Sequence, residues 1–345
     1  MKMRTLDGGT LPAVVEPEGD ARPEALVEWL SGERKWLDET LTETGAVLFR
    51  GFDTATPESF ERVARAVTPA LKKDYLGTSP RDALTEYVFS ASELPPYYPI
   101  PQHIEMSFTS APPERLFFSC LVAPGGQGGE TPLCDFRAVA RSLPASVRER
   151  FAARGVRNIR NYVGPSGGSR FDLWKLKRWD EMFQTTDRAI VEAKSAANGF
   201  EVTWRGAEGL CLSNVQPAFR THPETGESVW FNHAQVFHLS SVPGEYRRVA
   251  ARIGRTELRL LAHLSRAIVA AKRAFTAVEE QAMHCTFGDG TPISDDDMEA
   301  VRDAIWQNLR AFRWQRGDVL AIDNRSVSHG RMPYRGPRQI AVCWA

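Results

Sequence analysis

Residues 101–105 read Pro-Gln-His-Ile-Glu, and residues 328–330, far along the chain, read Ser-His-Gly. In a β-strand, the side chains of residues i and i+2 point to the same side. His103 and Glu105 can therefore reach one ion while Ile104 packs into the opposite wall, and His329 can complete the set from the end of another core strand. Two neutral imidazoles and one carboxylate on one face of a metal, with the other positions open, are the ligands of a mononuclear ferrous centre. The two stretches together predict a β-rich core built around a metal site.

The composition is that of an ordinary globular protein. The chain has 345 residues, with 43 Lys and Arg against 43 Asp and Glu, so its formal charge is zero. Such a balance gives no indication of nucleic-acid or anionic-membrane partners. No apolar run reaches the length of a membrane span, and the first residues lack the apolar region of a secretory signal. The five cysteines are scattered and odd in number, which argues against a disulfide framework or a thiolate zinc site. We therefore expect a cytoplasmic protein with reduced thiols.

The first part of the chain alternates helical and strand patterns. Residues 24–44 place apolar side chains at helical spacing, although Gly32 interrupts the pattern, and residues 57–70 predict another helix. Between them, residues 45–52 form a short apolar run bounded by glycines, which predicts a buried strand.

Later segments add strands and helical insertions. Residues 116–122 and 339–344 predict core strands, and residues 314–324 predict a turn followed by a strand. Residues 164–200 look irregular, and a loop of that length is usually a lid or disordered. Residues 245–282 give the longest helical pattern, whose many basic side chains favour a solvated face, with a docking surface for an acidic partner as the alternative. Strands interleaved with helical insertions predict a β-sandwich or barrel core.

Arginines are concentrated after His329. Arg331, Arg335 and Arg338 follow it within a short segment. A guanidinium on a returning strand can hold a carboxylate through two parallel hydrogen bonds. A 2-oxo acid that chelates iron through its keto and neighbouring carboxylate oxygens would need such an anchor for its far carboxylate. The alternative interpretation is an exposed arginine-rich hairpin.

With these features, the chain resembles the iron(II)/2-oxoglutarate-dependent dioxygenases of the taurine dioxygenase and clavaminate synthase-like superfamily. Within it, a glutamate rather than an aspartate at position 105 resembles the clavaminate synthase-like branch. The likeness is greatest to the group that includes the syringomycin-type aspartyl hydroxylases and plant homologues. Each landmark is weak alone, and their order along nearly the whole chain makes the resemblance specific. The landmarks are residues 44–52, 100–106, 128–132, 222–232 and 315–329, followed by the arginines up to residue 338.

The resemblance implies the roles of several residues. His103, Glu105 and His329 are expected to bind Fe(II). Thr131 is expected to hydrogen-bond the far end of 2-oxoglutarate, and Arg338 is the expected anchor of its carboxylate. Many relatives carry a further arginine where this chain has Val342 and Cys343, so Arg331 is kept as the reserve anchor.

The resemblance also implies the fold. We expect one dioxygenase domain over residues 1–345, with a distorted double-stranded β-helix (jelly-roll) core flanked by helices. Residues 1–95 would form an N-terminal flank and residues 96–345 the core. The N-terminal helices and insertions at about residues 164–200 and 245–300 would cover its open end.

The implied reaction consumes 2-oxoglutarate and O2, releases succinate and CO2, and hydroxylates an unactivated C–H bond, with desaturation or epoxidation as the alternatives. Glu105 argues against the related halogenases, which lack a carboxylate ligand. The implied substrate is a small molecule, an amino acid or an amino-acid-derived natural-product intermediate, either free or bound to a carrier protein. Arg81, Arg220 and Asn232 are candidate polar contacts for it, and His233 and His238 lie near the last of these in the sequence.

Two other classes of protein fit some of these observations. A jelly-roll hydrolase or isomerase that uses zinc or manganese would need neither Arg338 nor Thr131. A non-catalytic ligand-binding protein of the same fold would leave a buried carboxylate beside two histidines without a use, which is costly.

Overall fold

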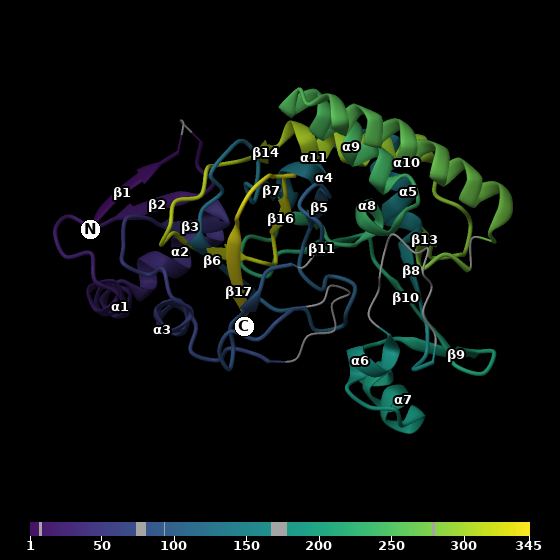
Figure 1. Cartoon of the computed structure of the whole chain (residues 1–345), viewed down its shortest axis with the longest axis horizontal. Helices are drawn as coiled ribbons and strands as arrows, with labels where there is room; N and C mark the ends of the chain where they lie inside the picture. Colours follow the sequence, from purple (N-terminus) through teal and green to yellow (C-terminus); the bar gives the residue numbers. More distant parts are fainter. Residues whose placement is uncertain (7–8, 74–80, 93, 167–177, 278–279) are drawn as a thin grey trace.

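The fold is organised around a large sheet (Figure 1). The computed structural model describes residues 1–6, 9–73, 81–92, 94–166, 178–277 and 280–345. Its strands pair in antiparallel fashion except β2 with β3, which are parallel. In spatial order, the seven-stranded sheet contains β1 (Lys2–Thr5), β2 (Ala13–Glu16), β3 (Ala46–Phe49), β15 (Val319–Asp323), β6 (Arg115–Val122), β17 (Gln339–Trp344) and β4 (Phe89–Ser90).

Both faces of this sheet are buried, which explains why its strands read as continuous apolar runs. Along β6, Leu116 and Phe118 face the main core, whereas Phe117 and Leu121 belong to a second core on the other side. That second core is closed by the apolar faces of α1 (Pro23–Gly32), α2 (Arg34–Thr44) and α3 (Pro57–Val67). The N-terminal helices therefore cover the outer face of the large sheet and not the open end of the barrel, where we had expected them.

A smaller sheet faces the large one across the main core and carries the candidate metal ligands. Its four strands are, in order, β14 (Leu309–Arg310), β7 (Leu133–Asp135), β16 (Val327–Arg331) and β5 (Ile100–His103). Leu133 and Val327 from this sheet pack in the same core as Phe118 from the large one. Two mainly antiparallel sheets that share one apolar interior form the expected jelly roll.

The remaining strands extend this core on one side. A four-stranded sheet has the order β13 (Met283–Phe287), β8 (Val156–Tyr162), β10 (Gly209–Gln216) and β9 (Glu201–Arg205). β11 (Phe219–Thr221) and β12 (Ser228–Trp230) form a two-stranded hairpin. The helices outside the N-terminal region are α4 (Phe136–Ser142), α5 (Ala145–Arg154), α6 (Trp179–Phe183), α7 (Arg188–Ala197), α8 (Ala234–Phe237), α9 (Ser241–Ile253), α10 (Thr256–Phe275) and α11 (Asp295–Gln307).

Three predicted segments differ from the structure. The helix expected over residues 24–44 is divided at Glu33, next to the interrupting Gly32. The helix expected over residues 245–282 is also two helices, because Gly254 adopts a left-handed conformation with φ 77° and ends α9. The stretch expected to be irregular contains α6 and α7 in its described part, and residues 167–177 of it lie outside the described residues.

Buried ion pairs join segments that are distant in sequence. The guanidinium of Arg50 donates to both carboxylate oxygens of Asp318 at 3.0 and 2.7 Å. Asp323 accepts from Arg115 at 2.7 Å and lies 2.8 Å from Nε2 of His222. Several landmarks of the sequence resemblance are thus partners in space, and the two arginine pairs join neighbouring strands of the large sheet.

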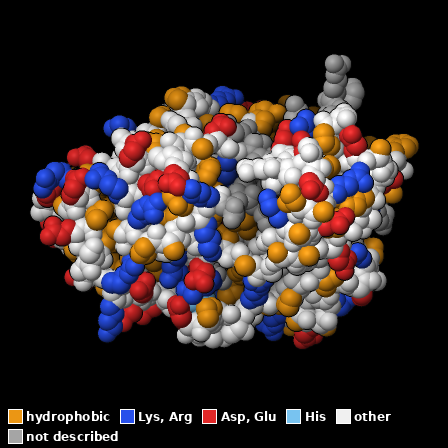
Figure 2. Space-filling model, turned by 90° about the horizontal axis from the view of Figure 1, so that it is seen from below, with side chains coloured by type: hydrophobic (Ala, Val, Ile, Leu, Met, Phe, Trp, Pro, Cys, Tyr) orange, Lys and Arg blue, Asp and Glu red, His pale blue; other side chains and the backbone are white. Residues whose placement is uncertain are grey.

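The surface has no dominant charge. Acidic and basic side chains are mixed over the face shown in Figure 2. On the basic helices, Arg247 and Arg248 pair with Glu299, and Arg273 pairs with Asp295. These pairs neutralise part of the positive charge and favour the solvated-face interpretation of α9 and α10. Within the described part of the chain, no helix combines the length and apolar character that crossing a bilayer requires.

Candidate metal centre and cosubstrate pocket

β5 ends at the first candidate ligand, and the chain turns before the second. His103 is the last residue of the strand, and Glu105 lies in the turn that follows. Ile104 is fully buried in the main core. The prediction that one strand carries both residues is therefore wrong, because the strand ends two residues before Glu105. The turn still returns the Glu105 carboxylate to the side on which His103 lies.

Asn324, which directly follows β15, fixes that turn. Its side-chain oxygen accepts from the backbone N–H of Glu105 at 2.9 Å. Its amide nitrogen donates to the carbonyl oxygens of Glu105 at 3.0 Å and of Pro113 at 2.8 Å. All of these groups are buried, so the amide satisfies backbone groups that water cannot reach. Asn324 thereby holds the backbone of the candidate carboxylate ligand on both sides.

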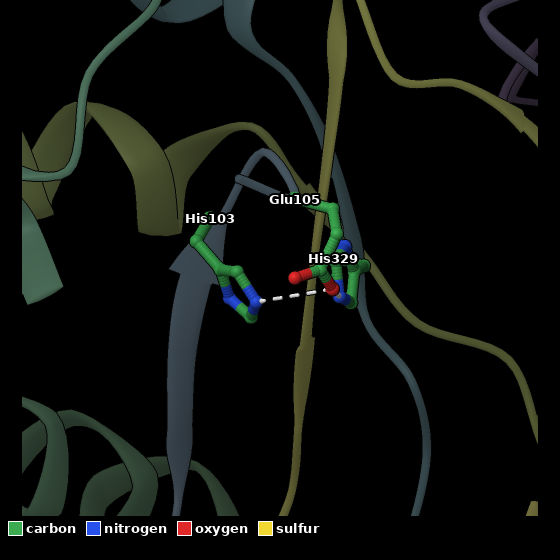
Figure 3. A group of neighbouring side chains, drawn as sticks. All are labelled: His103, Glu105 and His329. Carbon is green, nitrogen blue, oxygen red and sulfur yellow. Dashed lines mark ion pairs between the residues drawn. The ribbon is translucent and has the colours of Figure 1, made fainter. Parts of the chain in front are cut away.

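The structure brings the three candidate ligands together (Figure 3). β16 pairs with β5 so that His329 lies opposite His103, and their ring centroids are 4.3 Å apart. Nε2 of His329 lies 3.6 Å from Oε2 of Glu105, and Nε2 of His103 lies 4.0 Å from the same oxygen. One ligand atom from each of the three residues lies within 4.8 Å of the others.

The donor set fits a divalent cation. Nδ1 of His103 donates to the carbonyl of Pro101 at 2.9 Å, which leaves the Nε2 lone pair for a metal. Burial, reinforced by the nearby His103 and Arg81, holds the pKa of His329 well below its usual value, so this imidazole is neutral. Ligand atoms that share one face of a metal, with bonds of about 2.1 Å, lie about 3 Å apart. The Nε2–Oε2 separations of 3.6 and 4.0 Å would therefore need to shorten by about 1 Å or less for both imidazoles and the carboxylate to hold one ion.

A guanidinium lies against the candidate carboxylate ligand. Nη2 of Arg81 donates to Oε2 of Glu105 at 3.1 Å, and Nη1 donates to the carbonyl of Ala91 at 2.8 Å. Both charged side chains are almost completely buried. Of the three residues suggested as substrate contacts, Arg81 is therefore the one that the structure brings to the metal ligands.

Thr131 and Arg338 lie together beside the candidate metal ligands. Nη2 of Arg338 donates to Oγ1 of Thr131 at 3.3 Å, and Nε donates to the carbonyl of Gly129 at 2.8 Å. The indole of Trp314 donates to the same Thr131 oxygen at 3.1 Å. Burial lowers the pKa of Arg338 to about 10, so it remains a cation at neutral pH. One cavity is lined by these residues and by the ligand triad: His103, Glu105, Thr131, His329 and Arg338.

Arg331 lines the same cavity, but its guanidinium is bonded to the backbone. Nη1 donates to the carbonyl of Leu94 at 2.9 Å, and Nη2 donates to those of Pro95 at 2.7 Å and Tyr98 at 2.9 Å. These bonds attach the segment before β5 to β16.

Arg220 and Asn232 do not line this cavity. Arg220 lies over the ring of Phe231, 4.4 Å from its centroid. Asn232 is fully buried, and its amide bonds to the backbone of Ala218 and Ala234. Their polar atoms therefore serve the fold around β11 and β12.

His233 and His238 lie in different surroundings. His233 lines the cavity, and its Nδ1 is 2.6 Å from the hydroxyl of Ser107. Burial, with His103 and Arg160 nearby, keeps its pKa well below the usual value. His238 lies outside this cavity and bonds to Ser240 at 2.8 Å.

Sequence reasoning assigned no role to Trp314, Asn324 or Phe118. Trp314 and Asn324 act through hydrogen bonds to residues more than a hundred positions away. Phe118 lines the cavity with its ring centroid 4.9 Å from that of His329. A polar residue directly after a core strand was the available signal for Asn324, but nothing in the sequence identified its partners.

Comparison with known proteins places this geometry in a family. The chain matches the taurine catabolism dioxygenase TauD, TfdA family over residues 8–344. It is 29% identical over 306 residues to the dapdiamide synthesis protein DdaC of Enterobacter agglomerans, covering 89% of this chain and 83% of that protein. It is 28% identical over 337 residues to a clavaminate synthase-like protein of Arabidopsis thaliana, covering 95% and 92% of the two chains.

Solved structures agree on the fold. PvcB, an iron- and α-ketoglutarate-dependent oxygenase from an isonitrile synthetic pathway, superposes with a TM-score of 0.51 at 15% sequence identity, covering 96% of this chain and 84% of that chain. At this identity the likeness concerns the fold alone, and it confirms the predicted jelly roll. The match to the family extends over almost all of the sequence. The chain is therefore a dioxygenase and belongs to the taurine catabolism dioxygenase TauD, TfdA family.

Proposed function

We propose that this chain uses Fe(II), 2-oxoglutarate and O2 to hydroxylate an unactivated C–H bond of an amino-acid-derived natural-product intermediate. The observation that carries the proposal is the single cavity that contains the histidines and carboxylate, Thr131 and Arg338 together. A hydrolytic jelly-roll site would need the metal ligands but not a buried cation bonded to a threonine beside them.

His103, Glu105 and His329 are the proposed holders of iron. Bound iron, with 2-oxoglutarate and O2, supplies the oxidising power, and 2-oxoglutarate leaves as succinate and CO2. The hydrogen bonds of Asn324 to the Glu105 backbone orient the carboxylate. The ring of Phe118 against His329 keeps water from that side of the imidazole.

Arg338 is the proposed anchor for the far carboxylate of 2-oxoglutarate. Its bonds to Gly129 and Thr131 fix the guanidinium in one orientation before any ligand arrives, so little conformational entropy is lost on binding. The Thr131 hydroxyl already accepts from Arg338 and Trp314, so its own proton can be donated to the carboxylate. Arg331 is disfavoured as the anchor, because three carbonyl oxygens accept from its guanidinium.

The substrate class rests on the relatives. DdaC is named for dapdiamide synthesis. That name places a relative of this chain in small-molecule biosynthesis, so we propose a substrate of that class, either free or presented on a carrier protein. Arg81 lies at the metal ligands and is the proposed contact for an anionic group of that substrate.

Anaerobic titration tests the proposal. Fe(II) and then 2-oxoglutarate are added while the visible charge-transfer band of the bidentate chelate is followed. We expect the band in the wild-type protein and its loss in His103→Ala. Arg338→Met should raise the 2-oxoglutarate concentration needed for the band by about 10- to 150-fold, because a charge-assisted pair contributes about 1.5–3 kcal/mol.

Arg335→Met is the matched control. This arginine lies in the same segment, its side chain is exposed, and it pairs with Glu257. The control should bind 2-oxoglutarate like the wild type, and circular dichroism should show every variant folded. Absence of the band in folded wild-type protein would refute the proposed function. Unchanged binding in Arg338→Met would refute the anchor.

A further inference from the structure

A second, larger cavity adjoins the candidate site. It has a volume of about 390 Å³ and lies between α10 and the segments around α8 and residues 94–98. We call it the α10 groove. Five side chains line both the α10 groove and the cavity of the metal ligands: Leu94, Tyr98, Val236, Phe237 and Met283. The two spaces therefore meet along one set of mostly apolar side chains.

One face of α10 forms a wall of the groove. Leu261, Leu264, Ile268 and Val269 line it at spacings that place them on one side of a helix. The lining residues of α10 run from Leu261 to Lys272, which corresponds to about 16 Å along the helix axis. The groove is thus an elongated space whose long wall is apolar.

The wall is apolar without being part of the core. In Figure 1, α10 lies along the outer edge of the molecule, and its packing is mainly against α9. Leu258 and Leu261 contact the small core around α9, whereas Leu264, Ile268 and Val269 belong to none of the described core clusters. Leu264 is 56% exposed. Apolar side chains that face a cavity and contact no core are free to contact an apolar ligand.

The charges restrict the ligand. Among the described residues that line the α10 groove there is no Asp or Glu, and Lys272 is a cation. His238 also lines it, and burial, with Arg302 and His284 nearby, lowers the pKa of its imidazole to about 4. The groove therefore favours an uncharged or anionic apolar chain over a cationic one.

We propose that the α10 groove binds an extended apolar substituent, such as an acyl chain, of the substrate whose reacting end lies at His103, Glu105 and His329. This inference rests on the proposed function and narrows its substrate class. An amino-acid derivative with a long acyl chain would fill both spaces, and the free amino acid would leave the groove empty.

N-Octanoylglycine and N-acetylglycine are suitable probes, because they share a head group and differ in chain length. Burial of one methylene strengthens binding roughly fourfold, so the octanoyl probe should bind about 30-fold more tightly even if fewer than half of its additional methylenes are buried. Calorimetry on the metal-free protein measures this ratio. In the anaerobic Fe(II)–2-oxoglutarate complex, the octanoyl probe should also alter the visible band.

The helix offers a matched pair of variants. Leu264 lines the groove, whereas Leu260, one turn earlier and 65% exposed, does not. Leu264→Glu should reduce the chain-length ratio to about threefold or less, and Leu260→Glu should leave it unchanged. Both positions are exposed, so neither substitution should impair folding.

Several results would overturn the inference. Equal affinity for the two probes, or equal effects of the two substitutions, would exclude the groove as the chain site. Tight binding without any change of the visible band would place the chain apart from the metal ligands. A dimer that both substitutions dissociate, without a chain-length ratio, would assign this face to a second copy of the chain. If the visible band itself fails to form, the proposed function fails, and the calorimetric ratio still reports on the groove separately.

Discussion

Substitution of Asn324 by alanine should weaken both the fold and the metal site. The amide makes three buried hydrogen bonds, two to the backbone of Glu105 and one to the carbonyl of Pro113. A neutral buried hydrogen bond contributes about 1 kcal/mol, so the loss should be about 3 kcal/mol. With an unfolding entropy of about 2.1 cal/mol/K per residue, this corresponds to a decrease of roughly 4 °C in Tm.

The same substitution releases the turn that orients the Glu105 carboxylate. Removal of a residue that orients a ligand typically costs 10–100-fold in metal affinity. Mn(II) binding, measured by calorimetry under conditions where the variant is fully folded, should therefore weaken by at least about 10-fold. Urea unfolding of the metal-free protein gives the stability loss independently.

Asn308→Ala is the control. Asn308 ends α11 and donates to Ser142 at 3.1 Å and to Ala304 at 2.8 Å, away from the metal ligands. It should lower stability by less and leave Mn(II) affinity unchanged. Wild-type metal affinity in folded Asn324→Ala would refute the positioning role, and an unchanged urea midpoint would refute the hydrogen-bond argument.

Three further outcomes follow from the structure. Burial alone would raise the pKa of Asp323, but a hydrogen bond from a histidine and two nearby arginines outweigh burial and lower this pKa from 3.8 to about 2. The ionised carboxylate therefore stabilises the fold above pH 4, and about 2 kcal/mol of this stability is lost as the pH falls to 2. Asp323→Asn should flatten that pH dependence of the free energy of unfolding, measured in urea. Gly128 has φ +92°, and in Gly128→Ala the new Cβ would lie 2.0 Å from the carbonyl oxygen of Pro333. Gly226 has φ +71°, and the Cβ of Gly226→Ala would meet no atom within 4 Å. Thermal unfolding should show that Gly226→Ala loses about 1 kcal/mol of stability and that Gly128→Ala loses clearly more. Arg331→Met removes hydrogen bonds to three carbonyls and should lower the free energy of unfolding in urea by about 3 kcal/mol. The affinity of this variant for 2-oxoglutarate, measured by calorimetry, should change less than threefold. A loss of affinity like that of Arg338→Met would contradict the proposal that Arg338 is the anchor.

The sequence was sufficient for the core strands, because their apolar runs are local signals. β6 and β17 lie where residues 116–122 and 339–344 predicted them. The positions of α1, α2 and α3 could not be predicted, because an amphipathic helix indicates that it covers an apolar surface but not which one. The large sheet is apolar on both faces, and only the structure shows that these helices cover the outer one.

The proposed site, like the fold, has some features that the sequence predicted and others that only the structure shows. The ligand residue types and their spacing were visible in the sequence, but the geometry of the pair was not, since the turn at Glu105 is bonded by Asn324 far along the chain. The choice between Arg331 and Arg338 was also undecided. It depends on which guanidinium group already donates most of its hydrogen bonds to backbone carbonyl oxygens, and this is a property of the folded state alone.

The pairing of β5 with β16 has a consequence for biosynthesis. His103 and Glu105 leave the ribosome early, whereas His329, which lies opposite His103 in the sheet, is made near the end of the sequence. A nascent or truncated chain that lacks β16 has an imidazole and a carboxylate but not the third side chain of the triad. If these three side chains hold iron as proposed, high-affinity metal loading is deferred until β16 has been made, and the growing polypeptide carries no redox-active ion while its interior is still open.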